Sequence, residues 1–124
     1  MVKITKVKIT NRRRTLRHPT RWSARYMIDT RPDGWYECHV LDVSLGGAAL
    51  AVFGPAPEPD ARMRIELRTA ADSTSGLQLR GVARNLGAGD GTSGIRVGVE
   101  WHALTHLEEA LLAVLIEQPP ALIR

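Results

Sequence analysis

The chain has 124 residues, of which 44% are hydrophobic and 24% are charged, and this bounds it to one compact domain of ordinary globular composition. No apolar stretch approaches the roughly 20 residues that a transmembrane helix needs. We therefore expect a cytoplasmic protein, or the cytosolic domain of an inner-membrane protein if the chain is an excised fragment. The single cysteine, Cys38, has no partner within the chain, which excludes an intrachain disulfide and a cysteine-based zinc site.

Positive charge is concentrated at the start of the chain. Residues 1–31 hold ten of the seventeen lysines and arginines against one acidic residue, Asp29, whereas the remainder is net acidic. This split predicts a basic, flexible N-terminal arm over residues 1–11, joined to a mildly acidic body. The arm should attract an anionic partner, which composition leaves open as nucleic acid, an acidic surface or a phosphorylated small molecule.

From about Arg21 onward, apolar residues recur with period two and turn residues interrupt them at short intervals, the pattern of a small antiparallel sheet. The clearest strand is 62–68, where Met63, Ile65 and Leu67 should face a core while three arginines and a glutamate face water. The other expected strands are 22–30, 35–43, 47–53, 77–86 and 95–101. Turns are expected at 32–34, 54–60, 72–76 and 87–94.

Helical spacing is found near the end of the chain, in Leu107, Ala110, Leu111, Val114 and Leu115. Thr105 and Glu108 form a possible capping box before this stripe, and the prolines at 119–120 stop the helix. Since an open six-stranded sheet leaves two edges exposed, we expect the strands to close with the helix over one opening. The predicted fold class is all-β, a six-stranded antiparallel β-barrel with one C-terminal α-helix.

Three segments carry residue types that serve in enzymatic or metal chemistry, but none of them forms a convincing site. Ser44 lacks the flanking glycines of a nucleophile elbow. His102 and His106 are four residues apart, but no further ligand pair lies near them. The run 89–94 matches Gly-x-Gly-x-x-Gly, yet it precedes a strand, whereas the dinucleotide fingerprint follows one. We therefore expect no enzyme, no metal site and no cofactor.

Two short motifs are more informative. Arg13 and Arg17 form Arg-x-x-x-Arg, and Asp42, Ser44 and Gly47 form Asp-x-Ser-x-x-Gly, with a strand, a turn and a strand between the motifs. In this order and spacing they resemble the PilZ family, the bacterial receptor domain for cyclic di-GMP. The resemblance covers about residues 12–117, and its known fold is a six-stranded antiparallel barrel with a helix at its end. We expect this domain to span 12–118, followed by a tail over 119–124.

The residue types suit such a ligand. A guanidinium can grip phosphate oxygens or guanine O6 and N7, whereas a carboxylate suits the N1–H and N2–H edge of guanine. By resemblance, Arg13 and Arg17 are assigned to phosphate and guanine contacts, and Asp42, Ser44 and Gly47 to the other face of the site. In that assignment Ser44 donates or accepts a hydrogen bond, and Gly47 allows close approach of the ligand. Arg14 and Gly46 adjoin these residues and are further candidates.

The residue before Arg-x-x-x-Arg bears on stoichiometry. In relatives of the PilZ family an arginine there accompanies two stacked cyclic di-GMP molecules, and a bulky apolar residue accompanies one. Here the residue is Arg12, so the resemblance implies two ligands per chain. We expect the arm to become ordered as it closes over them, and this ordering is the proposed signal.

The resemblance thus implies a non-enzymatic receptor module that regulates motility or exopolysaccharide synthesis, for example of cellulose. Its effector is unknown and could be a covalently attached output domain, including a membrane polysaccharide synthase. One alternative is a small basic-armed barrel that binds single-stranded nucleic acid, although charge confined to the arm and few aromatic residues argue against specific nucleic-acid binding. Another is a PilZ-like interaction domain without ligand. Trp22, Trp35 and Trp101 are expected in the core.

Overall fold

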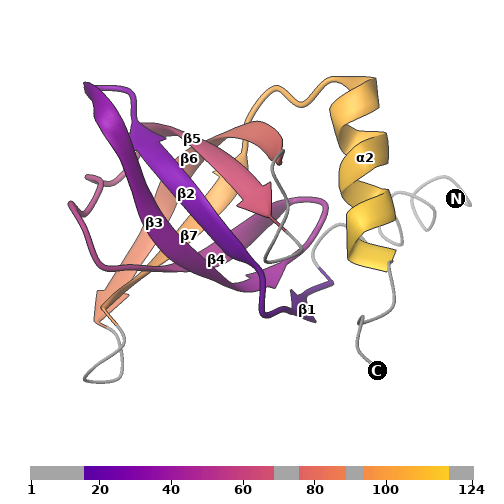
Figure 1. Cartoon of the computed structure of the whole chain (residues 1–124), viewed down its shortest axis with the longest axis horizontal. Coiled ribbons are helices and arrows are strands. Elements are labelled where there is room, and N and C mark those ends of the chain that lie inside the picture. Colours follow the sequence, from indigo (N-terminus) through magenta and orange to yellow (C-terminus); the bar gives the residue numbers. More distant parts are fainter. Residues whose placement is uncertain (1–15, 69–75, 89–93, 118–124) are drawn as a thin grey trace, which may run out of the picture.

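The computed structural model describes residues 16–68, 76–88 and 94–117. Within these ranges the chain forms seven strands followed by one helix (Figure 1). The elements are β1 (His18–Pro19), β2 (Ser23–Ile28), β3 (Arg31–Val43), β4 (Gly47–Val52), β5 (Arg62–Arg68), β6 (Leu77–Ala88), β7 (Ile95–Trp101) and α2 (His106–Glu117).

All strand pairs are antiparallel, in the order β1-β3-β2-β5-β6-β7-β4, and a further pairing of β3 with β4 closes the sheet into a barrel. The length of β3 makes this closure possible. Its first part pairs with β2, and its second part, Cys38–Val43, pairs with β4. The short strand β1 pairs with the last residues of β3, on the edge opposite to β4, and places His18 opposite Val43. The predicted six-stranded antiparallel barrel is confirmed, with one extra two-residue strand.

One predicted turn was misplaced. The segment 32–34 was expected to connect two strands, but it lies inside β3, and the hairpin turns at Asp29 and Thr30 instead. The pairing of Ile28 with Arg31 leaves only those two residues for the turn. Turn-forming residues such as Gly34 are tolerated in β3 because the register of its pairing with β2 shifts there, between the pairs Tyr26–Tyr36 and Ile28–Arg31.

The core fills the inside of the barrel with alternating residues from each strand. Met63, Ile65 and Leu67 are buried, as the pattern of 62–68 predicted. β4 is buried along its whole length, and its residues alternate between the core and an outer face occupied by Ala49 and Ala51. A strand of mostly small residues, covered on both sides, thus lies between β3 and β7.

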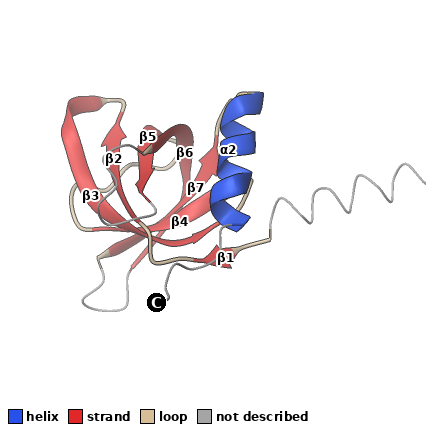
Figure 2. Cartoon of the chain, turned by 45° about the vertical axis from the view of Figure 1, so that its right-hand side comes forward, coloured by secondary structure: helices blue, strands red, loops and turns tan. Residues whose placement is uncertain are grey.

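α2 stands at one side of the barrel, after the loop that leaves β7 (Figure 2). The predicted capping box is confirmed, since Thr105 Oγ1 accepts from Glu108 N at 3.0 Å and Glu108 Oε1 accepts from Thr105 N at 2.9 Å. No helix in the described part of the chain has the length and apolar character needed to cross a membrane.

The predicted apolar stripe of the helix does not face the barrel. Leu107, Leu111 and Val114 are 68%, 43% and 56% exposed, whereas Leu112 is fully buried in the core. The run from Leu111 to Ile116 is apolar on every side of the helix, so periodicity alone does not define its buried face.

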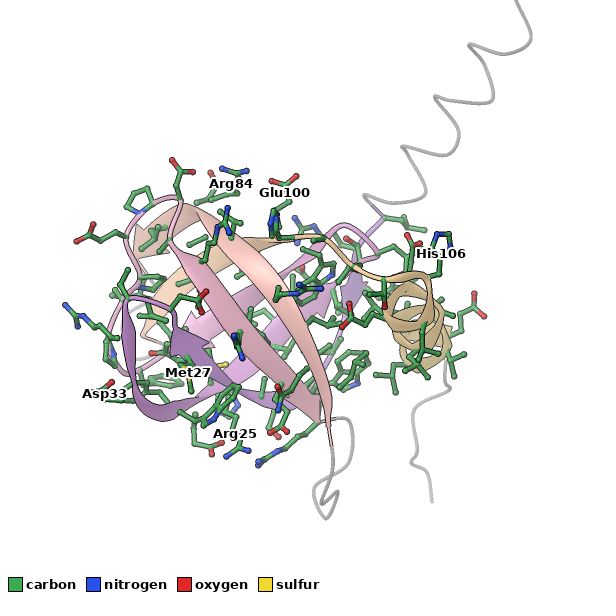
Figure 3. All side chains as sticks on the ribbon, turned by 90° about the horizontal axis from the view of Figure 1, so that it is seen from above. Arg25, Met27, Asp33, Arg84, Glu100 and His106 are labelled. Atoms are coloured by element: carbon green, nitrogen blue, oxygen red, sulfur yellow. The ribbon has the colours of Figure 1, made fainter. Side chains whose placement is uncertain are left out.

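A third correction concerns Glu66, which is predicted to face water on β5 but is 8% exposed. Its Oε1 accepts from Arg25 Nε at 2.6 Å and lies 3.3 Å from Arg68 Nη2. The Arg25 guanidinium also lies 4.9 Å from the ring centroid of Trp35, which is half-buried outside the core cluster and not within it as predicted. The outer face of β2 and β5 therefore carries a compact charged cluster (Figure 3 labels Arg25).

The Glu66 cluster predicts a pH dependence of stability. Burial alone would raise the pKa of Glu66, but the hydrogen bond and charge of Arg25 and the charge of Arg68 outweigh it and hold this pKa below 4.5. Because the folded-state pKa is lowered, the stabilisation is present above the unfolded-state pKa and is lost as the pH falls through the folded-state pKa. We expect the free energy of unfolding in urea to fall between about pH 5 and pH 3, and to fall less steeply in Glu66→Gln.

At pH 7 the Glu66→Gln variant should lose about 1–2 kcal/mol, because the partly buried Arg25 keeps no carboxylate partner. Glu58→Gln, at an exposed position, is the control and should follow the wild-type profile. Parallel loss of stability in wild type and Glu66→Gln would show that this ion pair does not contribute to the acid transition.

Candidate functional site

Asp42 lies at the centre of the candidate site, on the outer face of β3. It follows a register shift between Val40 and Asp42 in the pairing with β4, and it lies opposite Pro19 of β1 on the other side. Its Oδ1 accepts from Arg17 Nη1 at 2.7 Å, and its Oδ2 lies 3.5 Å from Arg96 Nη2. The carboxylate is thus held between two guanidiniums whose side chains are 51% and 54% exposed.

The Arg17–Asp42 pair brings the two sequence motifs together. Arg17 immediately precedes β1, and the pairing of β1 with the end of β3 places it beside Asp42. One arginine of Arg-x-x-x-Arg and the carboxylate of Asp-x-Ser-x-x-Gly are therefore in direct contact. The other predicted arginines, Arg12, Arg13 and Arg14, lie outside the described residues, as does the glycine-rich loop at 89–93.

Arg96 is a member of this site that the sequence reasoning missed. It lies on β7, and β4 separates β7 from β3, so the two strands lie two spacings, about 9.6 Å, apart. The side chains of Arg96 and Asp42 both reach over β4 to approach within 3.5 Å. The intervening residues on β4 are Ala49, opposite Asp42, and Ala51, opposite Arg96. These small side chains leave room for the arginine to cross above them.

On the outer faces of β3, β4 and β7, small side chains form a flat surface, here called the floor. Its border, here called the rim, carries the charged side chains of Asp42 and Arg96. Ala49 lies between Asp42 and Gly98, and Ala51 lies between His39 and Arg96. Gly98 carries no side chain, and Ala49 and Ala51 carry only a methyl group, whereas on the β6 side the Asn85 side chain borders Gly98. Ala49 and Ala51 are buried, so a flat, charged ligand could lie on this surface, with its polar edges directed at the rim, once the side chains that cover the alanines move aside.

Ser44 is placed in a turn between β3 and β4 and is 2% exposed. Its Oγ accepts from Gly46 N at 3.1 Å and from Gly47 N at 3.2 Å, and its backbone N donates to Gly47 O at 2.8 Å. The indole Nε1 of Trp101 donates to Ser44 O at 3.0 Å, and Trp101 N donates to Gly46 O at 3.0 Å. Ser44 therefore organises the turn that follows Asp42 and anchors it to the end of β7.

Gly47 has a structural reason to be glycine. A Cβ at this position would collide with the backbone carbonyl oxygen of Val99 on β7. The close approach is thus between two strands of the barrel. Contacts of Ser44 and Gly47 with a ligand stay predictions, whereas their roles in the turn and in the strand contact are observed.

Two aromatic rings lie near the rim of the floor. His39, opposite Ala51, meets the ring of Phe53 edge-on with centroids 5.7 Å apart, and Phe53 is 56% exposed. Of the tryptophans predicted in the core, Trp101 is buried and Trp22 packs partly buried against the core cluster.

The groups considered for catalysis or metal binding do not form a centre in the described ranges. No cluster of three or more His, Cys, Asp or Glu side chains that could hold a metal ion occurs there. α2 begins at His106, so His102 lies outside the helix and the two histidines do not share a helical face. Burial raises the pKa of the Cys38 thiol to about 12, which keeps it protonated and unreactive at neutral pH.

Comparison with known proteins identifies the family. The sequence model of the PilZ domain matches residues 11–118. The chain belongs to the PilZ domain family. No curated protein sequence is similar enough to the chain to count as a match.

Solved PilZ structures share this fold at low sequence identity. The PilZ domain of YcgR from Escherichia coli, solved with c-di-GMP, is 16% identical with a TM-score of 0.66, covering 85% of this chain and 88% of that one. The PilZ domain of CeSA from a cellulose-synthesizing bacterium is 21% identical with a TM-score of 0.61, covering 82% and 95%. The Bacillus subtilis inhibitor of motility, MotI/DgrA, is 12% identical with a TM-score of 0.65, and the match covers 82% of this chain but 47% of that longer one.

The role of Gly47 can be tested through stability. Because the added methyl group of Gly47→Ala meets the Val99 carbonyl, we expect a loss of about 1–3 kcal/mol in the free energy of unfolding, measured by urea denaturation. Gly34→Ala is a matched control, since a Cβ there meets nothing within 4 Å, and it should change stability by less than about 0.5 kcal/mol. Equal stability of the two variants would refute the packing role of Gly47.

Proposed function

We propose that this PilZ domain is a non-enzymatic receptor module for cyclic di-GMP. The observation that carries the proposal is the Asp42 carboxylate held between Arg17 and Arg96 on the outer face of the barrel. Cyclic di-GMP offers phosphate oxygens and guanine O6 and N7 to guanidiniums, and guanine N1–H and N2–H to a carboxylate. The site therefore contains a partner for each kind of polar group on the ligand.

Binding would proceed by an exchange of ion pairs. In the structure Arg17 and Arg96 neutralise Asp42; in the complex Asp42 accepts the guanine N–H groups, and both guanidiniums turn to phosphate or to the guanine acceptor edge. Arg17 and Arg96 are about half exposed, so their pairs with Asp42 are weak, on the order of 1 kcal/mol or less, and breaking them costs little.

The remaining predicted residues have different parts in this proposal. Arg13 supplies a further guanidinium to phosphate or guanine, by resemblance to the family motif. Gly46 and Gly47 act through the turn that fixes the end of β3, where Ser44 accepts their N–H groups. The Ser44 hydroxyl accepts from both N–H groups and lies 3.4 Å from Gly47 O, to which it donates, so we assign Ser44 mainly to holding the turn.

The fold likeness to the E. coli YcgR PilZ domain, which was solved with c-di-GMP, supports this choice of ligand. We further propose that ligand binding orders the N-terminal arm and that the ordered arm is the signal. Two similar structures suggest the process that the signal controls, because one is an inhibitor of motility and the other belongs to CeSA of a cellulose-synthesizing bacterium. Motility or exopolysaccharide synthesis is therefore the output we propose.

The two arginines give the direct test. Each charge-assisted contact is worth roughly 1.5–3 kcal/mol, so Arg17→Ala and Arg96→Ala should each weaken cyclic di-GMP binding at least about tenfold in calorimetric titration. Arg62→Ala, an exposed arginine on β5 with the same charge change, should stay within about twofold of wild type. Titrations with GTP and with a short single-stranded oligonucleotide should show much weaker binding.

Equal weakening by Arg62→Ala and the site variants would show general charge attraction instead of a defined site. Oligonucleotide binding as tight as that of cyclic di-GMP would favour the nucleic-acid alternative.

The same titration counts the ligands. Because a stacked pair carries four phosphate charges, a third arginine at position 12 has a partner that a single ligand lacks. We expect two molecules per chain, falling toward one in Arg12→Leu. Saturation of the wild-type chain at one ligand would contradict the stacked pair.

A further inference from the structure

A second cluster of polar side chains lies on the outer face of β5 and β6, next to the start of α2. A pocket of about 320 Å³ opens there, lined by Arg64, Gln78, Leu79, Arg80 and Glu108. It shares no residue with the candidate cyclic di-GMP site.

Two arginines of this pocket lie opposite each other, and nearby carboxylates compensate their positive charges only in part. Arg64 on β5 lies directly opposite Arg80 on β6, and like charges in that arrangement repel. Among the described residues, the carboxylate nearest to Arg64 is that of Asp29 at 3.9 Å, and the one nearest to Arg80 is that of Glu108 at 3.8 Å. Both distances are too long for a hydrogen bond. Arg80 Nη2 does donate to Ala103 O at 2.8 Å, which fixes that guanidinium beside the pocket.

A neighbouring arginine on β6 shows the contrast. Arg84 Nη1 lies 2.6 Å from Asp60 Oδ1, and Arg84 Nε lies 2.8 Å from Glu100 Oε1 (Figure 3 shows Arg84 beside Glu100). Two carboxylates of the chain thus form close ion pairs with the Arg84 guanidinium. In the described part of the chain it provides no carboxylate within hydrogen-bond distance of Arg64 or Arg80.

The pocket also contains acceptors. Gln78 lies opposite Glu66 of β5, and its amide oxygen can accept a hydrogen bond. Glu108 uses Oε1 to cap the helix, so its other oxygen can accept as well. An acidic peptide segment matches these groups, because it has a side-chain carboxylate for the arginines and backbone N–H groups for the acceptors of Gln78 and Glu108. A phosphodiester backbone, in contrast, has no N–H group to donate to Gln78 or Glu108.

We propose that this pocket binds an acidic segment of a partner polypeptide. One carboxylate of the segment lies between the guanidiniums of Arg64 and Arg80, and a backbone N–H of the segment donates to Gln78 or Glu108. The inference does not depend on cyclic di-GMP, because the two sites have no side chain in common. It gives the domain a surface through which a protein partner could be recognised.

The test is an amide NMR titration of the full chain with the acetylated, amidated peptide Gly-Glu-Glu-Gly. We expect saturable shifts at residues 77–80 and 106–109, without shifts at residues 40–44. Arg64→Gln should raise the dissociation constant at least fivefold. Arg84→Gln removes the same charge from the same sheet, but from an arginine outside the pocket, and should change it less than twofold.

Two further probes complete the experiment. The peptide Gly-Gln-Gln-Gly should bind at least fivefold more weakly, since it lacks the carboxylates. Inorganic phosphate should not displace Gly-Glu-Glu-Gly at equal concentration. Absence of saturable shifts, equal binding of the glutamine peptide, equal effects of the Arg64 and Arg84 substitutions, or efficient displacement by phosphate would each overturn the proposal.

Discussion

The pairing of β3 with β4 is the constraint on which the barrel and the candidate site both depend. It closes the sheet, and its register shift between Val40 and Asp42 sets where Asp42 lies on the outer face. The same closure places β4 between β3 and β7, so that Arg96 can approach Asp42 across a floor of alanines. The turn organised by Ser44 and anchored by Trp101 then fixes the end of β3 relative to β7.

In the exchange that we propose, one carboxylate has two sets of partners. In the structure, Asp42 pairs with two exposed guanidiniums on the barrel surface. With a guanine base bound, the same carboxylate would accept the base donors and release those guanidiniums to the phosphates or the acceptor edge. Because exposed ion pairs contribute little stability, the exchange costs little free energy while the arginines stay close to where the ligand needs them. A preorganised but weakly held site of this kind suits a receptor that must respond reversibly.

Local patterns predicted most of the fold. Period-two alternation located the strands, and the capping box at Thr105 and Glu108 located the start of the helix, because both depend on neighbours in sequence. Features set by distant contacts were missed. The burial of Glu66 depends on Arg25 in another strand, and the buried face of α2 depends on where the helix meets the barrel.

The same distinction between local patterns and distant contacts applies to the residues of the candidate site. Arg17 and Asp42 could be proposed because they lie in recognisable motifs, and the structure brings them together. Arg96 lies in no motif, and only the order of strands around the closed barrel brings it to Asp42. Ser44 and Gly47 were found by the same motif, yet the structure gives them roles in a turn and a strand contact that residue type alone does not specify.

The most direct measurement compares cyclic di-GMP affinity in Asp42→Ala and Asp42→Asn by calorimetry. Both substitutions remove the same negative charge and free the same arginines, but only asparagine keeps an oxygen that accepts a guanine N–H. If Asp42 binds guanine, Asp42→Ala should lose at least about tenfold in affinity and Asp42→Asn should lie between it and wild type. Tighter binding by both variants, to a similar extent, would show that the site attracts charge alone and would contradict the account.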